Sequence, residues 1–190
     1  MNENKKSKLD IEVKNERIDF CRVYEDPTSK TYNVYLTNCI DEVFNFHCLF
    51  ETLRKASKDD NVVIHINSPG GYIDTTLQII NSMKECKAEI TTIIEGEACS
   101  AGSIIFLEGN KRLVREHGLM MCHYYSGGMK GKGNITISKA KFEDEFFKKF
   151  FRKIYKGFMT KEEIEKMIEG EDFWFDSKEV EKRLNESSIN

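Results

Sequence analysis

The sequence predicts an α/β layered fold, in which strands and helices alternate and parallel strands are joined by right-handed crossovers. Residues 61–68, NVVIHINS, form a short apolar run that stops at the turn residues SPGG, as a buried strand does. Residues 89–96, EITTIIEG, repeat that pattern. Between and before these strands lie segments with helical periodicity, and residues 40–56 carry the clearest set: Phe46, Leu49, Phe50 and Leu53.

The elements follow one another in a regular order from the N-terminal end. Residues 1–30 are polar and charged, and we expect an arm or a weak hairpin outside the core. A β-branched and aromatic strand at 32–38 precedes the first helix, and a second helix at 74–86 places Leu77, Ile80 and Met83 on one face. A third helix is expected from Ser100 to 109, followed by short strands at 111–116 and 119–125.

The C-terminal part is helical. A long helix over 138–158 carries a wide aromatic stripe, which we expect to exceed what one intrachain face can bury. Thr160 and Glu163 fit a capping box that opens a last helix, and Gly170 is placed to close it. The stripe consists of Phe142, Phe146, Phe147, Phe150, Phe151, Ile154, Tyr155 and Phe158.

The composition argues against several classes of function, namely nucleic-acid binding, membrane insertion and metal binding. The chain has 190 residues and a net charge of -3, from 29 basic and 32 acidic residues, so we expect one domain over 31–190 and no nucleic-acid partner. No apolar leader and no run of about 18 apolar residues occurs, so we expect no membrane segment. The six cysteines show neither CxxC nor metal-type spacing, which favours reduced thiols in a cytoplasmic protein without metal or cofactor.

Three positions carry candidate chemistry. Ser100 lies among small residues at a strand-to-helix turn, where it is either a helix N-cap or a nucleophile. The segment NSPGG is either a plain turn or a source of a backbone amide donor at the carboxyl end of a parallel strand. His123 follows an apolar strand, as a structural residue or a general base, and the GxSxG elbow of α/β-hydrolases is absent because position 98 is Ala.

Taken together, these motifs resemble the proteolytic subunit of the Clp protease. INSPGG is followed by Ser100, 29 positions after Gly71, in ACSAGS, and then by His123 in MCHYY. The resemblance runs from about Val34 to Leu184 and implies the ββα superhelix shared by Clp-type peptidases and crotonases, with 138–158 as a protruding handle helix. YLTNCI and YYSGG depart from the family pattern, which indicates a divergent bacterial or phage-encoded relative.

The resemblance implies roles for individual residues. Ser100 corresponds to the nucleophile, His123 to the general base, and Asp172, in the loosely matching DFWFDSKEV, to the acid that orients the imidazole. Asp176 competes for that last role, because spacing alone does not exclude it. The amides of Gly71 and Ala101 would form the oxyanion hole. The implied substrate-binding residues are Gly70, Tyr72, Tyr124, Ser126 and Gly127.

The function implied is that of a serine endopeptidase subunit. Heptameric rings, stacked in pairs, would enclose the active sites, and a separate AAA+ ATPase would deliver unfolded polypeptides. Three alternatives stay open: a phage head-maturation protease acting on one scaffold protein, a crotonase-type acyl-CoA enzyme of the same fold, and a catalytically silent assembly subunit.

Overall fold

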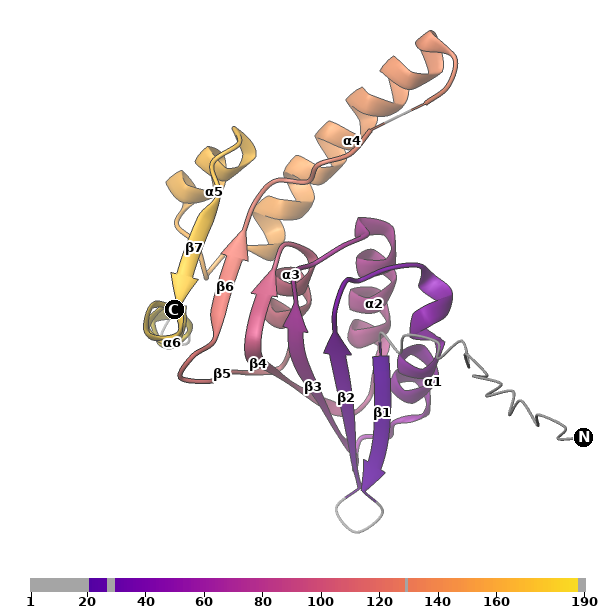
Figure 1. Ribbon diagram of the computed structural model, residues 1–190, viewed down its shortest axis with the longest axis vertical. Helices are drawn as coiled ribbons and strands as arrows, with labels where there is room; N and C mark the ends of the chain where they lie inside the picture. Colours follow the sequence, from indigo (N-terminus) through magenta and orange to yellow (C-terminus); the bar gives the residue numbers. More distant parts are fainter. Residues whose placement is uncertain (1–20, 27–29, 129, 188–190) are drawn as a thin grey trace, which may run out of the picture.

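A seven-stranded sheet organises the computed structural model, which describes residues 21–26, 30–128 and 130–187 (Figure 1). The strand order is β1-β2-β3-β4-β6-β7, and β5 pairs with β4 beside β6. The strands are β1 (Cys21–Asp26), β2 (Thr31–Thr37), β3 (Asn61–Ser68), β4 (Glu89–Cys99), β5 (Lys111–Val114), β6 (Leu119–Cys122) and β7 (Phe173–Asp176).

The centre of the sheet is parallel and its edges are antiparallel. Strands β2, β3, β4 and β6 run in one direction, whereas β1 pairs antiparallel with β2 and β7 antiparallel with β6. The long β4 pairs first with β5 along 91–94 and then with β6 along 97–99. The carboxyl ends of β3, β4 and β6 therefore meet at one edge of the sheet, which is where α/β folds place their sites.

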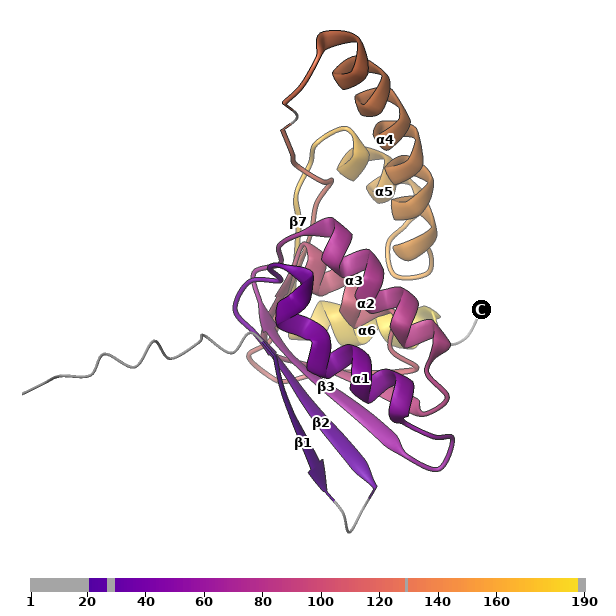
Figure 2. The same ribbon diagram turned by 90° about the vertical axis from the view of Figure 1, so that its right-hand side faces the viewer.

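Helices cover one face of this sheet and extend beyond it. Figure 2 shows α1 (His47–Lys55), α2 (Ile73–Glu85) and α3 (Ala101–Leu107) stacked against the same face. The long α4 (Gly133–Ile154) projects away from the carboxyl edge, and α5 (Lys161–Ile168) and α6 (Ser177–Ser187) complete the chain (Figure 1). The mixed α/β fold predicted from the sequence is confirmed.

The core lies between the sheet and the three stacked helices and continues among the inner end of α4, α5 and α6. The predicted helical-spacing residues Phe46, Leu49, Phe50 and Leu53 are each at most 2% exposed. The first of them lies in a short 3-10 helix, η1 (Val43–Phe46), so the predicted α-helix at 40–56 is wrong in its first turns. None of the helices that the structure describes is both long enough and apolar enough to cross a membrane.

The C-terminal part differs from the prediction in its boundaries. Helix α4 begins at Gly133 rather than at 138 and ends at Ile154, because Tyr155 and the three residues after it form a turn. The capping box is present, since Thr160 Oγ1 accepts from Glu163 N at 3.2 Å and Glu163 Oε2 accepts from Thr160 N at 2.8 Å. Gly170 follows α5 with φ +112°, as predicted for a helix end.

The aromatic stripe of α4 divides into a buried half and an exposed half. Phe147 and Phe151 are 6% and 2% exposed, and they pack on the chain's own Tyr124 and Tyr125. This half is covered within the subunit, so only the rest of the stripe exceeds what one intrachain face buries, as predicted. The outer half is not fully covered by the other described residues of the subunit, and its Phe142 and Phe146 are 69% and 44% exposed.

The predicted N-terminal arm lies mostly outside the described residues. Residues 1–20 and 27–29 are not among them, and residues 21–26 form β1 at the edge of the sheet. The antiparallel pairing of β1 with β2 makes residues 21–26 an edge strand of the sheet rather than part of a separate arm.

Candidate active site

Ser100 lies at the junction between β4 and α3, in a backbone conformation that few residues adopt. Its φ of 53° and ψ of -119° lie in a region that favours glycine. A non-glycine residue held there costs about 1–3 kcal/mol, and such residues cluster at functional sites. The sheet helps to hold the conformation, because Ser100 N donates to Met121 O of β6 at 2.9 Å.

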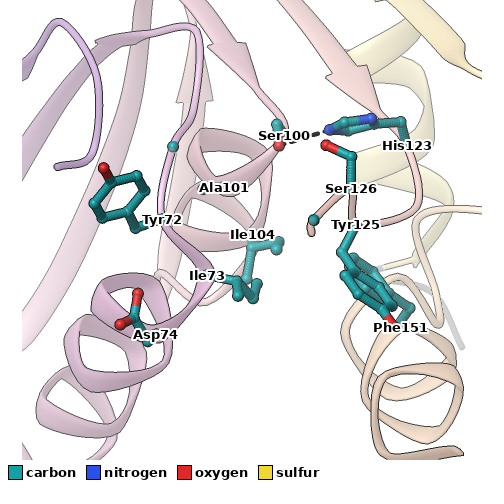
Figure 3. A pocket seen from close by; sticks show the side chains of 12 residues that line it. Tyr72, Ile73, Asp74, Ser100, Ala101, Ile104, His123, Tyr125, Ser126 and Phe151 are labelled. Carbon is teal, nitrogen blue, oxygen red and sulfur yellow. Dashed lines mark hydrogen bonds between the residues drawn. The ribbon is translucent and has the colours of Figure 1, made fainter. Parts of the chain in front are cut away.

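The hydroxyl of Ser100 contacts a histidine and leaves the helix end uncapped. Ser100 occupies the N-cap position of α3, yet its side chain makes no capping hydrogen bond. Its Oγ lies 2.7 Å from Nε2 of His123, the residue that directly follows β6 (Figure 3). When Nδ1 carries the ring proton, Nε2 accepts from the serine hydroxyl, which is the arrangement in which an imidazole can remove that proton.

Two glycines bring the turn after β3 against this serine. Gly70 has φ +100°, and a Cβ built on it would lie 2.6 Å from Ser100 Cβ and 2.7 Å from Cys99 O. Gly71 has φ +153°, and a Cβ there would run into the backbone of Ile40. Neither position has room for a side chain, so the NSPGG segment makes a backbone contact that other residues would prevent.

Two backbone amides beside Ser100 have no partner in the described part of the chain. In the turn, Gly70 N donates to Ser68 Oγ at 3.2 Å and Tyr72 N donates to Ile40 O at 2.7 Å, whereas Gly71 N donates to no described protein group. Ala101 N, at the first position of α3, is also free among the described residues. Both residues line the cavity that holds Ser100, where their N–H groups are available to a ligand oxygen.

The ladder between β6 and β7 ends at Cys122 and Phe173, which are the neighbours of His123 and Asp172 in the sequence. Cys122 pairs with Phe173, so extending the ladder by one residue brings Asp172 opposite His123. In a ladder extended in this way the two side chains would lie on the same face of the sheet, because directly paired residues point to the same side. No hydrogen bond joins them among those made by the described residues, and Asp172 is exposed.

The competing acid is placed elsewhere. Asp176 pairs with Leu119, four residues and therefore about 13 Å along the strand from His123. Its Oδ1 accepts from Glu179 N at 2.8 Å, which makes it the N-cap of α6.

A cavity of about 320 Å³ opens beside Ser100 and His123 (Figure 3). Three of the residues expected to contact substrate line it, namely Tyr72, Ser126 and Gly127. Gly70 lies behind Ser100, and Tyr124 points toward α4, where its hydroxyl donates to Asp144 O at 3.2 Å. Gly70 and Tyr124 are therefore not among the residues that line the cavity.

The apolar wall of the cavity was not predicted from the sequence. It is formed by Ile73, Ile104, Tyr125 and Phe151. The position of Tyr125 could have been predicted, because it follows His123 by two residues. On an extended chain, residues at positions i and i+2 point to the same side. Nothing in the sequence indicated that Phe151 lines the cavity, because this residue belongs to the long helix α4, which follows the strand elements that carry Ser100 and His123.

The two cysteines beside the candidate residues are held as neutral thiols. Burial raises the pKa of Cys99 to about 11 and that of Cys122 to about 12. A thiol is nucleophilic as its thiolate, so neither competes with Ser100 near neutral pH. Within the described ranges, no group of three or more His, Cys, Asp or Glu side chains is arranged to hold a metal ion.

The sequence is similar to proteins of one family. A family model described as Clp protease matches residues 27–182. The ATP-dependent Clp protease proteolytic subunit of Oltmannsiellopsis viridis is 32% identical over 90 residues, which cover 46% of this chain and 46% of that protein. The subunit of the same name from Chlorella vulgaris is 32% identical over 90 residues, covering 46% of this chain and 45% of that protein. The similarity to these curated relatives thus spans about half of their length.

Proposed function

Because this chain belongs to the Clp protease family, we propose that it is a serine endopeptidase subunit with Ser100 as its nucleophile. The observation that carries the proposal is the 2.7 Å contact between Ser100 Oγ and His123 Nε2, made by a serine in a strained backbone conformation. Glycine would adopt that conformation more easily, but it would supply no hydroxyl. A catalytic need for the hydroxyl therefore explains why a serine, rather than a glycine, occupies this strained backbone conformation.

The first chemical step forms a bond between Ser100 Oγ and the carbonyl carbon of the scissile peptide. His123 Nε2 takes the hydroxyl proton as this bond forms, and the carbonyl oxygen becomes an oxyanion. The amides of Gly71 and Ala101 would bind that oxyanion, and loss of one such donor typically costs about 2.7–4 kcal/mol of barrier lowering. His123 then gives the proton to the leaving amine, and an acyl-enzyme remains.

Deacylation repeats the same steps with water. His123 removes a proton from water, the resulting hydroxide attacks the acyl carbon, and Ser100 Oγ leaves with the proton returned from the imidazole. Asp172 would accept from His123 Nδ1–H, which fixes the tautomer and stabilises the imidazolium. The choice of Asp172 over Asp176 is supported by the β6–β7 register, in which Cys122, the residue before His123, pairs with Phe173, the residue after Asp172.

The cavity supports a peptide substrate. Its apolar side chains, from Ile73, Ile104, Tyr125 and Phe151, form a wall next to the reacting atoms. Such a wall favours an apolar substrate side chain beside the scissile bond, since its burial contributes about 25 cal/mol per Å² of apolar surface. Tyr72, Ser126 and Gly127 would contact the peptide at the rim of the cavity.

The projecting end of α4 supports assembly into rings. It exposes four large apolar side chains, on Ile135, Ile137, Phe142 and Phe146. Contiguous exposed apolar patches of more than a few hundred Å² are rare on monomers and mark interaction sites. We infer a homo-oligomer of heptameric rings, stacked in pairs through α4, that receives unfolded polypeptides from a separate AAA+ ATPase.

The alternatives differ in what they need from the site. A crotonase-type acyl-CoA enzyme would use the two amides but has no role for the Ser100–His123 contact. A head-maturation protease would use the same chemistry on one scaffold protein. A silent assembly subunit would leave Ser100 unreactive.

A fluorophosphonate probe tests the proposal directly. We expect mass spectrometry of the assembled protein to find the adduct on Ser100, and Ser100→Ala and His123→Ala to abolish both labelling and peptide hydrolysis. Ser138→Ala, which changes an exposed serine on α4, is the matched control and should label normally. Wild-type protein that is folded and assembled, yet neither labels nor cleaves unfolded polypeptides, would refute the peptidase assignment.

A further inference from the structure

A buried chain of hydroxyl groups lies behind Ser100, outside the cavity. Ser103 Oγ is 2.6 Å from the carbonyl oxygen of Ser100 and 2.8 Å from the hydroxyl oxygen of Tyr155. Both side chains are 0% exposed, and they come from positions 52 apart in the sequence. Neither residue lines the cavity, so neither can touch a substrate there.

The direction of these hydrogen bonds follows from the number of protons. A carbonyl oxygen accepts and cannot donate, so the single hydroxyl proton of Ser103 points to Ser100 O. Ser103 Oγ then has lone pairs left but no second proton, and Tyr155 must be the donor to it. The chain therefore runs from the Tyr155 hydroxyl through the Ser103 hydroxyl to the Ser100 carbonyl, and hydrogen bonds aligned in this way strengthen one another.

The carbonyl that receives this chain belongs to the same peptide unit as the amide of Ala101. A trans peptide is planar, and its C=O and N–H point in opposite directions. Ser103 Oγ is the closest of the three donors to Ser100 O, since Ser103 N lies at 3.0 Å and Ile104 N at 3.4 Å. Anchoring the oxygen on the buried side therefore aims the Ala101 N–H toward the cavity.

Tyr155 is itself firmly held. Its N–H donates to Phe151 O at 3.0 Å, and its ring stacks on the Phe151 ring with centroids 5.9 Å apart and planes 7° apart. Burial, and then the neighbouring Cys122, raises the pKa of Tyr155 well above its usual value. The hydroxyl thus keeps its proton and stays a donor at neutral pH.

We propose that Tyr155, acting through Ser103, is a positioning residue that fixes the Ser100–Ala101 peptide so that the Ala101 amide meets the oxyanion. The inference rests on the proposed serine peptidase chemistry and adds a residue to it. It links the base of α4 to the oxyanion hole, because Tyr155 caps the C-terminal end of that helix.

The test removes the hydroxyl groups while keeping the packing. Tyr155→Phe and Ser103→Ala should each lower kcat about 10-fold, less than the roughly 100- to 1,000-fold caused by loss of an oxyanion donor. KM should change little, because substrate binding does not use this amide. A peptide aldehyde, whose adduct with Ser100 places an oxyanion in the same position, should bind weaker by the same factor as kcat falls. The double variant should be no worse than the single ones, since both break one chain.

Thr92→Val is the matched control. Thr92 is a buried residue whose hydroxyl donates to Phe106 O at 2.8 Å, near the other end of α3. The substitution removes the same kind of hydroxyl–carbonyl hydrogen bond from the same helix without touching the Ser100 peptide. We expect it to lower the melting temperature by an amount similar to Ser103→Ala and to leave kcat and aldehyde affinity near wild type.

The outcomes separate the two proposals. Wild-type protein that fluorophosphonate does not acylate would overturn the peptidase itself. An active wild type with Tyr155→Phe and Ser103→Ala both at wild-type kcat and aldehyde affinity would overturn the positioning role alone. The positioning role would also be overturned if Thr92→Val lowered kcat as much as Ser103→Ala does, because the fall in kcat would then reflect a general loss of order in α3. If Tyr155→Phe does not fold, Ser103→Ala gives the same readouts.

Discussion

Replacing Glu163 with glutamine is expected to remove a defined, pH-dependent part of the stability of this protein. Glu163 makes two hydrogen bonds of 2.8 Å to the guanidinium of Arg183, and Arg183 Nε donates to Glu179 at 2.7 Å. The guanidinium also lies 4.6 Å from the ring centroid of Phe175. These contacts join α5 to α6 and β7, so the charge of one carboxylate helps to hold the C-terminal elements together.

The size of the effect follows from the pKa of Glu163. The hydrogen bonds from Arg183, and after them the bonds from Thr160, lower this pKa from 4.5 to about 2. At about 1.36 kcal/mol per pKa unit, the shift corresponds to roughly 3 kcal/mol. The side chain is 22% exposed. Solvent therefore screens part of the interaction, and we expect a loss of about 1–3 kcal/mol.

The sign of the pH dependence is fixed by the direction of that shift. A carboxyl whose pKa is lower in the native state stabilises that state above the pKa of the unfolded chain, near 4.5. Its contribution falls as the pH drops below 4.5 and is lost near pH 2. Glutamine can still accept from Thr160 N in the capping box, so Glu163→Gln isolates the loss of charge.

Urea unfolding of the wild type and of Glu163→Gln at pH 7, 4 and 3 measures this difference. We expect the gap in unfolding free energy to be largest at pH 7 and to narrow as the pH falls. Glu162→Gln is the matched control, because its side chain is 78% exposed and pairs with Lys166 on the same helix. A gap at pH 3 equal to that at pH 7 would refute the assignment of the stabilisation to the carboxylate charge.

Three further predictions concern the active site and the assembly. Gly70→Ala should lose fluorophosphonate labelling and about 1–2 kcal/mol or more of stability, because a side chain at φ +100° would clash with Ser100; a stable, fully labelled variant would contradict the close approach. Asp172→Asn should lower kcat by about 10⁴-fold, whereas Asp176→Asn should keep both kcat and stability, because Asn is about as good an N-cap as Asp and can still accept from Glu179 N; the reverse result in peptide-hydrolysis assays would transfer the acid role to Asp176. Phe142→Glu with Phe146→Glu should shift sedimentation to a smaller species without lowering the melting temperature, and an unchanged assembly would show that this end of α4 makes no subunit contact.

Local patterns predicted most of the α/β framework. Buried strands β3 and β4 contain short apolar runs, and α1 and α2 carry apolar side chains at helical spacing, so each is visible in a short window. Strand β4 continues three residues past its predicted end at Gly96, to Cys99. Strand β7 and helix α6 were not predicted. The four residues of β7 are too few to show periodicity, and they form a strand because β6 lies beside them.

Local patterns could not predict what covers a helix face. The spacing of Phe147 and Phe151 places them on one side of α4, but only the fold brings Tyr124 and Tyr125 against them. The same limit applies to the site. The resemblance indicated Ser100, His123 and the two amide-bearing residues, whereas Ser103 and Tyr155, 52 positions apart, have no local signal that they meet.

The antiparallel pairing of β7 with β6 also affects the order in which this protein can be completed during synthesis. Ser100 and His123 both precede α4, but the strand that carries Asp172 to the sheet follows both α4 and α5. A ribosome adds about 5–20 residues per second, so the segment between His123 and Asp172 delays that strand by several seconds. With Asp172 as the proposed acid, a nascent chain that already holds Ser100 and His123 would still lack that acid, and the proposed hydrolysis would be confined to chains whose C-terminal elements have been synthesised and docked.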